Sequence, residues 1–178
     1  MDPVNAARSR EEAAFLELMD EHYLPLFRFA YRMTGSAEEA EDVVQECFLE
    51  LLRPQCRYDP RRTSVRTYLF GIVRNQSLKR LRKKDQTAPD DQTPSHHPSP
   101  ERGLLRAELE QAIARAVREL PETQREVLVL AHYEQMPLAE IASVLAIDVA
   151  AVKSRLQRAR ASLKKTLAAF APGMERRP

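Results

Sequence analysis

The sequence has few of the features that enzymes and membrane proteins display. Its 178 residues include only four glycines, and no Walker-type phosphate loop, nucleophile elbow or zinc-ligand spacing occurs. No apolar stretch approaches the roughly 18 residues that a membrane span needs. We therefore expect no cofactor, no metal site and no membrane insertion. The adjacent pair His96-His97 lacks further ligands and is interpreted as solvated loop.

Cysteine is scarce as well. Cys47 and Cys56 form neither a disulfide framework nor a Cys-x-x-Cys pair, so we interpret them as reduced thiols of a cytosolic protein, without deciding whether either senses redox. The N-terminus, Met-Asp-Pro-Val-Asn, lacks the basic start and apolar run of a signal peptide. We expect a soluble, cytoplasmic chain.

Charge is present in quantity, and its two signs are segregated along the chain. The net charge is only +2, but residues 36–50 hold six acids and no Lys or Arg. Residues 53–84 hold eleven Lys and Arg with one acid, and residues 149–165 hold six with none. One acidic and two basic patches indicate more than one kind of partner.

The pattern of apolar residues predicts an all-α protein of two small helical domains. The hydrophobic content of 43% suffices for a core, and the abundant Leu, Ala, Glu and Arg favour helix. Residues 85–103 contain four prolines and no large apolar side chain, which is typical of a flexible linker. We predict domains at 10–84 and 104–170 and a tail at 171–178. The linker is long enough for the domains to sit on separate segments of one duplex.

Local signals place several helix ends. Ser36 and Glu39 predict a capping box, followed by a helix whose core stripe is Val44, Phe48, Leu51 and Leu52. After a polar loop to about residue 64, apolar spacing predicts a helix from 65 to 81. In the second domain, Pro121 and Pro137 mark two helix starts, and Asp148 is a suitable N-cap for the last helix.

The last three helices have the layout of a helix-turn-helix DNA reader. In the final one, Val152, Leu156, Ala159 and Leu163 form the inner face, and cations with no acid project elsewhere. Lys153 and Arg155 can take phosphates or guanine edges. The alternative is an amphipathic helix with an ordinary basic side.

The acidic stretch 36–50 has two functional interpretations. No His, Cys or Gly-rich loop lies nearby to complete a catalytic or metal site. A solvated acidic face with Val43 exposed beside it is better interpreted as a docking surface for a basic partner.

The basic helix 65–84 combines cations with Tyr68, Phe70 and Asn75. Cations track phosphates and rings stack on unpaired bases, so this combination suits single-stranded nucleic acid. The loop Arg57-Tyr-Asp-Pro-Arg-Arg62 offers groups to an extruded base. The alternative is a solubilising face with both rings in the core.

Three of these motifs together resemble the bacterial extracytoplasmic-function (ECF) RNA polymerase sigma factors over roughly residues 15–168. Residues 40–49 (AEDVVQECFL) resemble the family's polymerase-binding helix, and residues 65–75 (VRTYLFGIVRN) its promoter-melting helix. The stretch from Leu120 to Arg160 resembles its region four. The motifs stand in the family's order, with a linker between the second and third.

The resemblance implies a sigma factor that directs RNA polymerase core enzyme to specific promoters, assists DNA melting, has no catalytic activity, and is usually held by an anti-sigma factor. Contacts would be made with the clamp helices of the largest polymerase subunit and the flap of the second. The implied polymerase-binding residues are Asp42, Val43, Gln45, Glu46 and Leu49. The implied minus-ten and melting residues are Arg57, Tyr58, Asp59, Arg62, Tyr68, Arg74, Asn75 and Lys79. The implied minus-thirty-five residues are Ala151, Lys153, Ser154, Arg155 and Arg158.

The chain departs from the family pattern at a few positions. Tyr68 stands where many members carry Trp, and Lys79 where an Asp is common. Ala146 replaces a frequent turn glycine, so we expect an unusual turn or strain there. Ala150 and Ala151 offer little polar readout at the start of the last helix.

Two other functions are compatible with parts of the sequence. A free-standing DNA-binding regulator would use only the second domain, and its first domain would sense a ligand or dimerise. The acidic stretch beside a basic helix, without evident pocket residues, argues against it. A nucleic-acid-processing enzyme would need a metal or nucleophile constellation, which the sequence does not show.

Overall fold

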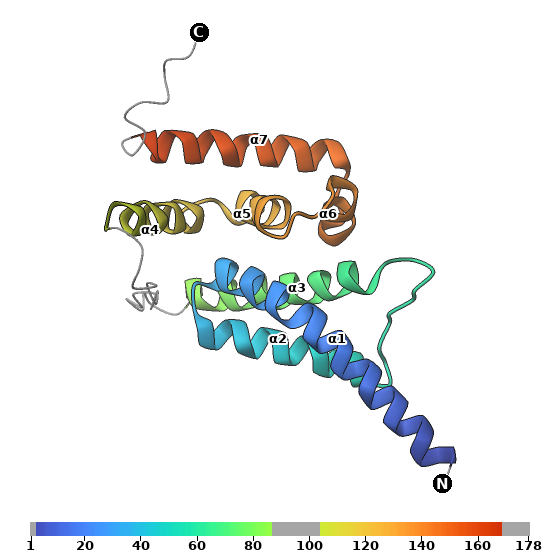
Figure 1. The fold of residues 1–178 in the computed structure, drawn as a ribbon. Helices are drawn as coiled ribbons and strands as arrows, with labels where there is room; N and C mark the ends of the chain where they lie inside the picture. Colours follow the sequence, from blue (N-terminus) through green and yellow to red (C-terminus); the bar gives the residue numbers. More distant parts are fainter. Residues whose placement is uncertain (1–2, 87–103, 169–178) are drawn as a thin grey trace.

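The computed structural model describes residues 3–86 and 104–168, and in this part of the chain every regular element is helical (Figure 1). The prediction of an all-α fold is confirmed. The elements are α1 (Pro3–Thr34), α2 (Ala37–Leu52), α3 (Val65–Gln86), α4 (Leu104–Arg118), α5 (Glu122–Leu128), the π-helical segment η1 (Val129–Tyr133), α6 (Leu138–Leu145) and α7 (Val149–Thr166). We call α1–α3 the first domain and α4–α7 the second.

The first domain is a three-helix bundle closed by aromatic contacts. Phe29 of α1 meets Phe70 of α3 edge to face, with ring centroids 5.6 Å apart, and Phe15 of α1 meets Phe48 of α2 at 6.1 Å. Such aromatic pairs contribute about 0.5–1.5 kcal/mol beyond their buried area. Fully buried aliphatic side chains from all three helices complete this core: Leu26, Met33, Val43, Val44, Leu69 and Val73.

The turn between α1 and α2 is fixed by two hydroxyl groups. The Ser36 hydroxyl accepts a hydrogen bond from the Glu39 amide at 3.3 Å, which confirms the predicted N-cap. The Ser36 amide donates to the Thr34 hydroxyl at 3.4 Å. Thr34 therefore takes the part that the Glu39 side chain would play in a capping box. Gly35, at φ +79°, supplies the left-handed backbone of this turn.

The second domain stacks α7 over the other helices in Figure 1. Its core contains Val127, Leu130, Ile141, Leu145 and Val152, all buried. The Asp148 carboxylate accepts a hydrogen bond from the Ala151 amide at 2.6 Å, which confirms the predicted cap of α7. α5 continues directly into η1, and α6 and α7 are the two helices of the helix-turn-helix, joined by the turn at residues 146–148.

Several predicted boundaries differ from the structure. α1 begins at Pro3, before the predicted domain start at residue 10, and α3 runs to Gln86, two residues into the predicted linker. The remaining linker residues 87–103 and residues 169–178 lie outside the described part of the chain. Leu52 was placed in the core stripe of α2, but as the final residue of the helix it is 61% exposed, whereas Leu51 before it still packs against the core.

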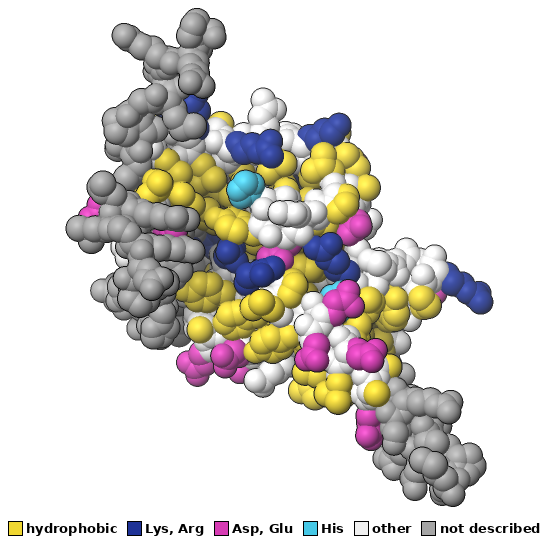
Figure 2. All heavy atoms as spheres, viewed as in Figure 1, with side chains coloured by type: hydrophobic (Ala, Val, Ile, Leu, Met, Phe, Trp, Pro, Cys, Tyr) yellow, Lys and Arg dark blue, Asp and Glu magenta, His cyan; other side chains and the backbone are white. Residues whose placement is uncertain are grey.

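The two domains pack directly against each other. α3 contacts α6, and α1 contacts α4, α5 and η1. Figure 2 shows Lys and Arg side chains gathered on one face where the two groups of helices meet. Among the described residues, no helix combines the length and apolar character required to cross a membrane.

The turn that ends α6 generates a test of the fold. Ala146 has φ +52° and ψ +46°, and the Ile147 amide donates to the Ala142 carbonyl at 3.1 Å, as in a glycine-ended helix. The unusual turn expected at Ala146 is therefore present, as a left-handed residue. Because the Cβ of Ala costs roughly 1 kcal/mol there, we expect Ala146→Gly to raise the free energy of unfolding by about that amount.

Urea unfolding followed by circular dichroism measures this change. The control is Ala161→Gly, at an exposed position within α7, which should lower the free energy of unfolding by about 0.5–1 kcal/mol. A loss of stability in both variants would show that Ala146 is not strained.

Candidate nucleic-acid and polymerase interface

The acidic face of α2 is open to solvent. The side chain of Asp42 is 61% exposed and that of Glu46 38% exposed. Gln45 is exposed, and Leu49 is 58% exposed beside them. Arg80 of α3 lies 3.8 Å from Asp42 and 3.6 Å from Glu46, and partly exposed ion pairs of this length are weak. The face therefore keeps an acidic rim around an apolar side chain.

Val43 does not belong to this face. The sequence placed it exposed beside the acids, but it is fully buried. The reason is the helical period, which puts Val43 on the same side as Ala40, Val44 and Cys47, all of them buried. The apolar group at the acidic face is Leu49 instead.

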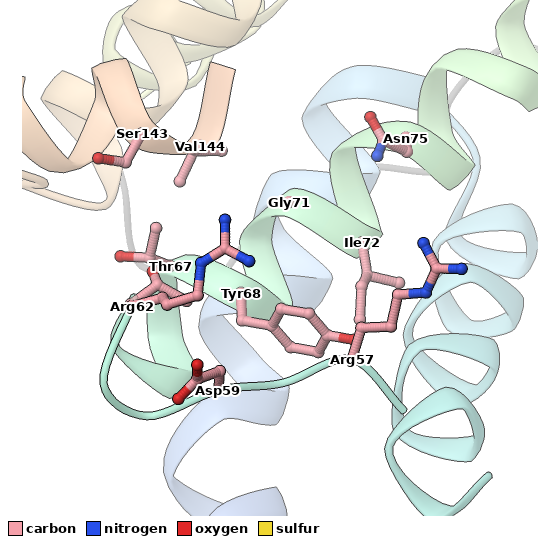
Figure 3. Close-up of a pocket in the computed structure, with 11 residues that line it drawn as sticks. Arg57, Asp59, Arg62, Thr67, Tyr68, Gly71, Ile72, Asn75, Ser143 and Val144 are labelled. Carbon is pink, nitrogen blue, oxygen red and sulfur yellow. The ribbon is translucent and has the colours of Figure 1, made fainter. Parts of the chain in front are cut away.

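A pocket of about 450 Å³ lies between the 57–63 loop and α3 (Figure 3). Five of the eight residues predicted to bind the minus-ten element line it together: Arg57, Asp59, Arg62, Tyr68 and Asn75. Ser143 and Val144 face the same space from α6 of the second domain. No pattern in the sequence predicted that a helix of the second domain lines this site.

The loop beside the pocket is shaped by Asp59. Its carboxylate accepts a hydrogen bond from the Arg61 amide at 2.9 Å, and its main-chain carbonyl accepts from the Arg62 amide at 3.0 Å. An Asp that bonds to the backbone two residues on forms an Asx turn. In this structure Asp59 therefore orders the loop, while Arg57 and Arg62 remain exposed.

Of the two rings on α3, only Tyr68 reaches the pocket. Phe70 is 1% exposed and lies in the core. For this ring, the alternative of a solubilising helix face with its aromatic side chains buried is correct. Tyr68 is half-buried, and its ring centroid lies 5.3 Å from that of Tyr58. Burial, followed by the contact with the Cys56 thiol, raises the pKa of Tyr68 above its ordinary value. The phenol therefore stays neutral.

Cys47 and Cys56 have different surroundings. Cys47 is buried, and burial raises the pKa of its thiol to about 12, so almost no reactive thiolate forms near neutral pH. Cys56 is half-buried with its sulfur 3.8 Å from the Tyr68 hydroxyl. Within residues 3–86 and 104–168, no three His, Cys, Asp or Glu side chains are grouped as they would be around a metal ion.

The last helix presents only some of its cations to solvent. Lys153, Ser154 and Arg158 are exposed, and Arg158 donates to the Ser154 hydroxyl at 3.1 Å. Ala151 is half-buried in the first turn, where its amide is taken by the cap. Arg155 is 24% exposed and turns toward the protein.

Arg155 and Arg74 bind one buried carboxylate that sequence reasoning missed. Glu126 of α5 is 1% exposed. Its Oε2 lies 2.7 Å from Nε of Arg74 in the first domain, and its Oε1 lies 3.1 Å from Nη1 of Arg155 in α7. A predicted melting residue and a predicted minus-thirty-five residue are thus held together. The sequence predicted that both side chains are free to bind DNA, but in this structure both are paired with Glu126.

A second buried carboxylate crosses the same interface. Glu134 is 5% exposed, and its Oε2 lies 3.1 Å from Nη2 of Arg28 in α1. Arg66 of α3 donates to the Glu134 carbonyl at 2.7 Å, and Arg125 of α5 donates to the Met33 carbonyl at 2.9 Å. Each of these polar contacts between the domains is therefore made by an arginine. The sequence signal for these two acids is slight: Glu126 directly precedes the apolar run 127–131, and Glu134 follows the end of that run by three residues.

Comparison with known proteins finds two family models that match successive parts of the chain. Residues 18–87 match the model of Sigma-70 region 2, and residues 110–163 match Sigma-70, region 4. The ECF sigma factor SigL of Mycobacterium tuberculosis is 34% identical over 94% of this chain and 96% of its own. The ECF sigma factor RpoE of Cereibacter sphaeroides is 31% identical over 84% of each chain. SigW of Bacillus subtilis is 29% identical over 92% of this chain and 94% of its own.

Solved structures share the fold. CnrH in complex with the cytosolic domain of CnrY has a TM-score of 0.68 and 29% identity, over 94% of this chain and 97% of that one. The sigma factor RpoE of Bartonella quintana, in complex with the anti-sigma factor NepR, has a TM-score of 0.69 and covers 90% of this chain and 99% of its own. At 24% identity, the latter shows the fold alone.

The chain belongs to the ECF RNA polymerase sigma factors, a family of transcription regulators. This confirms the resemblance identified in its sequence.

Proposed function

We propose that this protein directs RNA polymerase core enzyme to specific promoters, assists the melting of promoter DNA, and has no catalytic activity of its own. The observation that carries the proposal is the separation of three surfaces on a member of this family. An exposed acidic face lies on α2, a pocket with cations and a ring lies beside α3, and exposed cations lie on α7. Each surface has the chemistry of a different part of the initiation complex.

The acidic face of α2 would dock on the clamp helices of the largest polymerase subunit. Asp42, Gln45 and Glu46 would supply the polar contacts, and Leu49 an apolar one at the centre. An exposed apolar side chain ringed by charge suits such an interface, because charge aligns the partners and apolar burial holds them. The second domain would contact the flap of the second subunit.

The pocket beside α3 would capture an unpaired base of the minus-ten element. Arg57 and Arg62 would hold phosphates, and Tyr58 and Tyr68 would offer rings for stacking. Asp59 would shape the loop, while Asn75, Lys79 and a released Arg74 would follow the separated strand along α3.

The last helix would bind the minus-thirty-five element in the major groove. Lys153, Ser154 and Arg158 are exposed for this purpose, and Arg155 would join them after leaving Glu126. An Arg that reaches a guanine edge gives about 1–3 kcal/mol of discrimination. Because Ala151 has no polar side chain, polar recognition of bases at the start of the helix would depend on the neighbouring side chains.

Control by an anti-sigma factor is part of the proposal. Two proteins with this fold were solved with partner proteins, one of them described as an anti-sigma factor. Because its partners would be polymerase and DNA, we place the protein in the cytoplasm.

Run-off transcription tests the proposed function. Purified protein is added to polymerase core enzyme on a pool of promoter fragments, and transcripts are sequenced. We expect discrete start sites downstream of a shared two-part motif. A protein that binds DNA but gives no transcripts with core enzyme is instead a free-standing regulator. If the purified protein cleaves the DNA fragments instead, it is a nucleic-acid-processing enzyme.

The acidic face generates a prediction about polymerase binding. We expect the double variant Asp42→Lys and Glu46→Lys to bind core enzyme at least about tenfold more weakly, because like charges then oppose each other across the interface. Fluorescence anisotropy of labelled protein measures the affinity. The control is Glu17→Lys, which changes an exposed acid on α1. Equal affinities for both variants and the wild type would remove α2 from the polymerase interface.

The ring in the pocket generates a prediction about melting. Tyr68→Ala should slow formation of the open complex by about tenfold and leave closed-complex binding nearly unchanged, because stacking acts on unpaired bases. Tyr68→Phe keeps the ring and is the control. Permanganate footprinting measures opening, and gel shift measures closed binding. If both steps weaken equally in Tyr68→Ala, the ring acts only in packing.

A further inference from the structure

We propose that the groove between α1 and α4 binds an amphiphilic anion, a molecule that joins an apolar chain to one carboxylate or phosphate group. The groove has a volume of about 830 Å³, within the range of about 300–1,000 Å³ that is usual for ligand sites. None of the described residues that line it is among the proposed polymerase or DNA contacts. The inference therefore adds a binding site to the proposed function and does not depend on it.

The groove has an aromatic wall and an aliphatic wall. Phe27 and Tyr31 of α1 form the first, with their rings almost parallel at 10° and their centroids 6.3 Å apart. Ile113 and Ala114 of α4 belong to the second, and Tyr133 of η1 adds a further ring. All five side chains are half-buried, so each keeps apolar surface that an occupant would remove from water.

Arginine supplies the charged surface of the groove. Four arginines and one acid, Glu110, are among the described residues that line it. Figure 2 shows Lys and Arg side chains among hydrophobic ones where the two groups of helices meet. Two of the four arginines have partners within the protein. Arg28 pairs with Glu134 at 3.1 Å, and Arg32 lies over the Tyr133 ring, 3.9 Å from its centroid.

Arg115 and Arg118 are the two arginines that remain. In the part of the chain that the structure describes, their guanidinium groups have no hydrogen-bond or ion-pair partner, although Arg118 is half-buried. Burial lowers the pKa of Arg125, Glu122 opposes this shift, and the nearby charge of Arg118 adds to it. Arg118 thus repels a cation of its own domain. A guanidinium binds a carboxylate or phosphate through two parallel hydrogen bonds, and such a ligand would relieve this repulsion.

The combination of these surfaces determines the class of ligand. A small inorganic anion would pair with Arg115 and Arg118 but leave the apolar walls in water. A neutral hydrocarbon would cover the walls but leave both guanidinium groups unpaired. A nucleotide would place a polar sugar against Ile113 and Ala114. A chain with one anionic end satisfies both surfaces, because its charged end and its apolar body meet different parts of the groove.

Decanoate is a suitable probe for this site. Isothermal titration calorimetry with the full-length protein, below the concentration at which decanoate forms micelles, measures its affinity without polymerase or DNA. We expect saturable binding of one decanoate per protein. Each methylene taken from water should tighten binding about fourfold, so octanoate, which is two methylenes shorter, should bind at least about tenfold more weakly.

Two further probes separate the parts played by charge and by the apolar chain. Decanol has the same chain without the carboxylate, and it should bind at least about tenfold more weakly than decanoate because it cannot form charge-assisted hydrogen bonds with arginine. Inorganic phosphate has charge without a chain, and an excess of it should displace little decanoate.

The double variant Arg115→Gln and Arg118→Gln tests the charged end of the site. It should weaken decanoate binding at least about tenfold and leave decanol binding unchanged, because only the carboxylate needs the guanidinium groups. A merely structural role of these arginines would change the binding of both probes alike. The control is Arg53→Gln with Arg82→Gln, which removes two exposed arginines elsewhere on the chain and should bind both probes like the wild type.

Ala114→Trp tests the apolar part of the site. The larger side chain should fill the groove and weaken the binding of decanoate and decanol together, at least about tenfold. The control is Ala161→Trp, at an exposed position in α7. Circular dichroism reports whether each variant is folded. If Ala114→Trp is not folded, the double arginine variant decides the outcome.

Three results would overturn the proposal. The first is the absence of saturable decanoate binding, which would leave the groove to a protein partner. The second is equal affinity for decanol and decanoate, which would show that the groove does not select an anion. The third is wild-type affinity for decanoate in the double arginine variant, which would place the bound molecule elsewhere.

Discussion

The buried carboxylate of Glu126 is the constraint on which the arrangement of this molecule depends. An ionised acid at 1% exposure is costly unless cations and hydrogen bonds surround it. Here the cations are Arg74 from the first domain and Arg155 from α7, so the two domains and the last helix satisfy one charge together. Removing either arginine leaves the acid underpaired. The same contact that joins the two domains therefore occupies two arginines that would face DNA in the proposed function.

The candidate binding surfaces differ in how accessible they are. The acidic face of α2 is open, since Asp42, Glu46 and Leu49 all reach solvent. Lys153 and Arg158 of α7 are exposed as well. Arg155, by contrast, is paired with Glu126, and residues of α6 line part of the pocket beside α3.

The sequence predicted the features that depend on neighbouring residues. The caps at Ser36 and Asp148 and the unusual turn at Ala146 follow from local chemistry, and the structure shows each of them. Val43 was wrongly placed outside, although the helical period alone puts it on the same side as Ala40 and Cys47. The other errors arose where the answer depends on distant packing: where the core stripe of α2 stops, and so the exposure of Leu52, depends on how far α1 and α3 cover the helix. Glu126 was missed because its partner Arg74 is 52 residues away.

The distance between the domains tests the central claim most directly. Spin labels at cysteines replacing exposed Gln55 and Ala161, in a Cys56→Ser background that leaves only buried Cys47, allow pulsed electron paramagnetic resonance. The account predicts one narrow, short distance in the wild type and a broader or longer distribution in Glu126→Gln, in which Arg74 and Arg155 lose the charge that they share. A broad distribution in the wild type, or a distance that Glu126→Gln leaves unchanged, would contradict it.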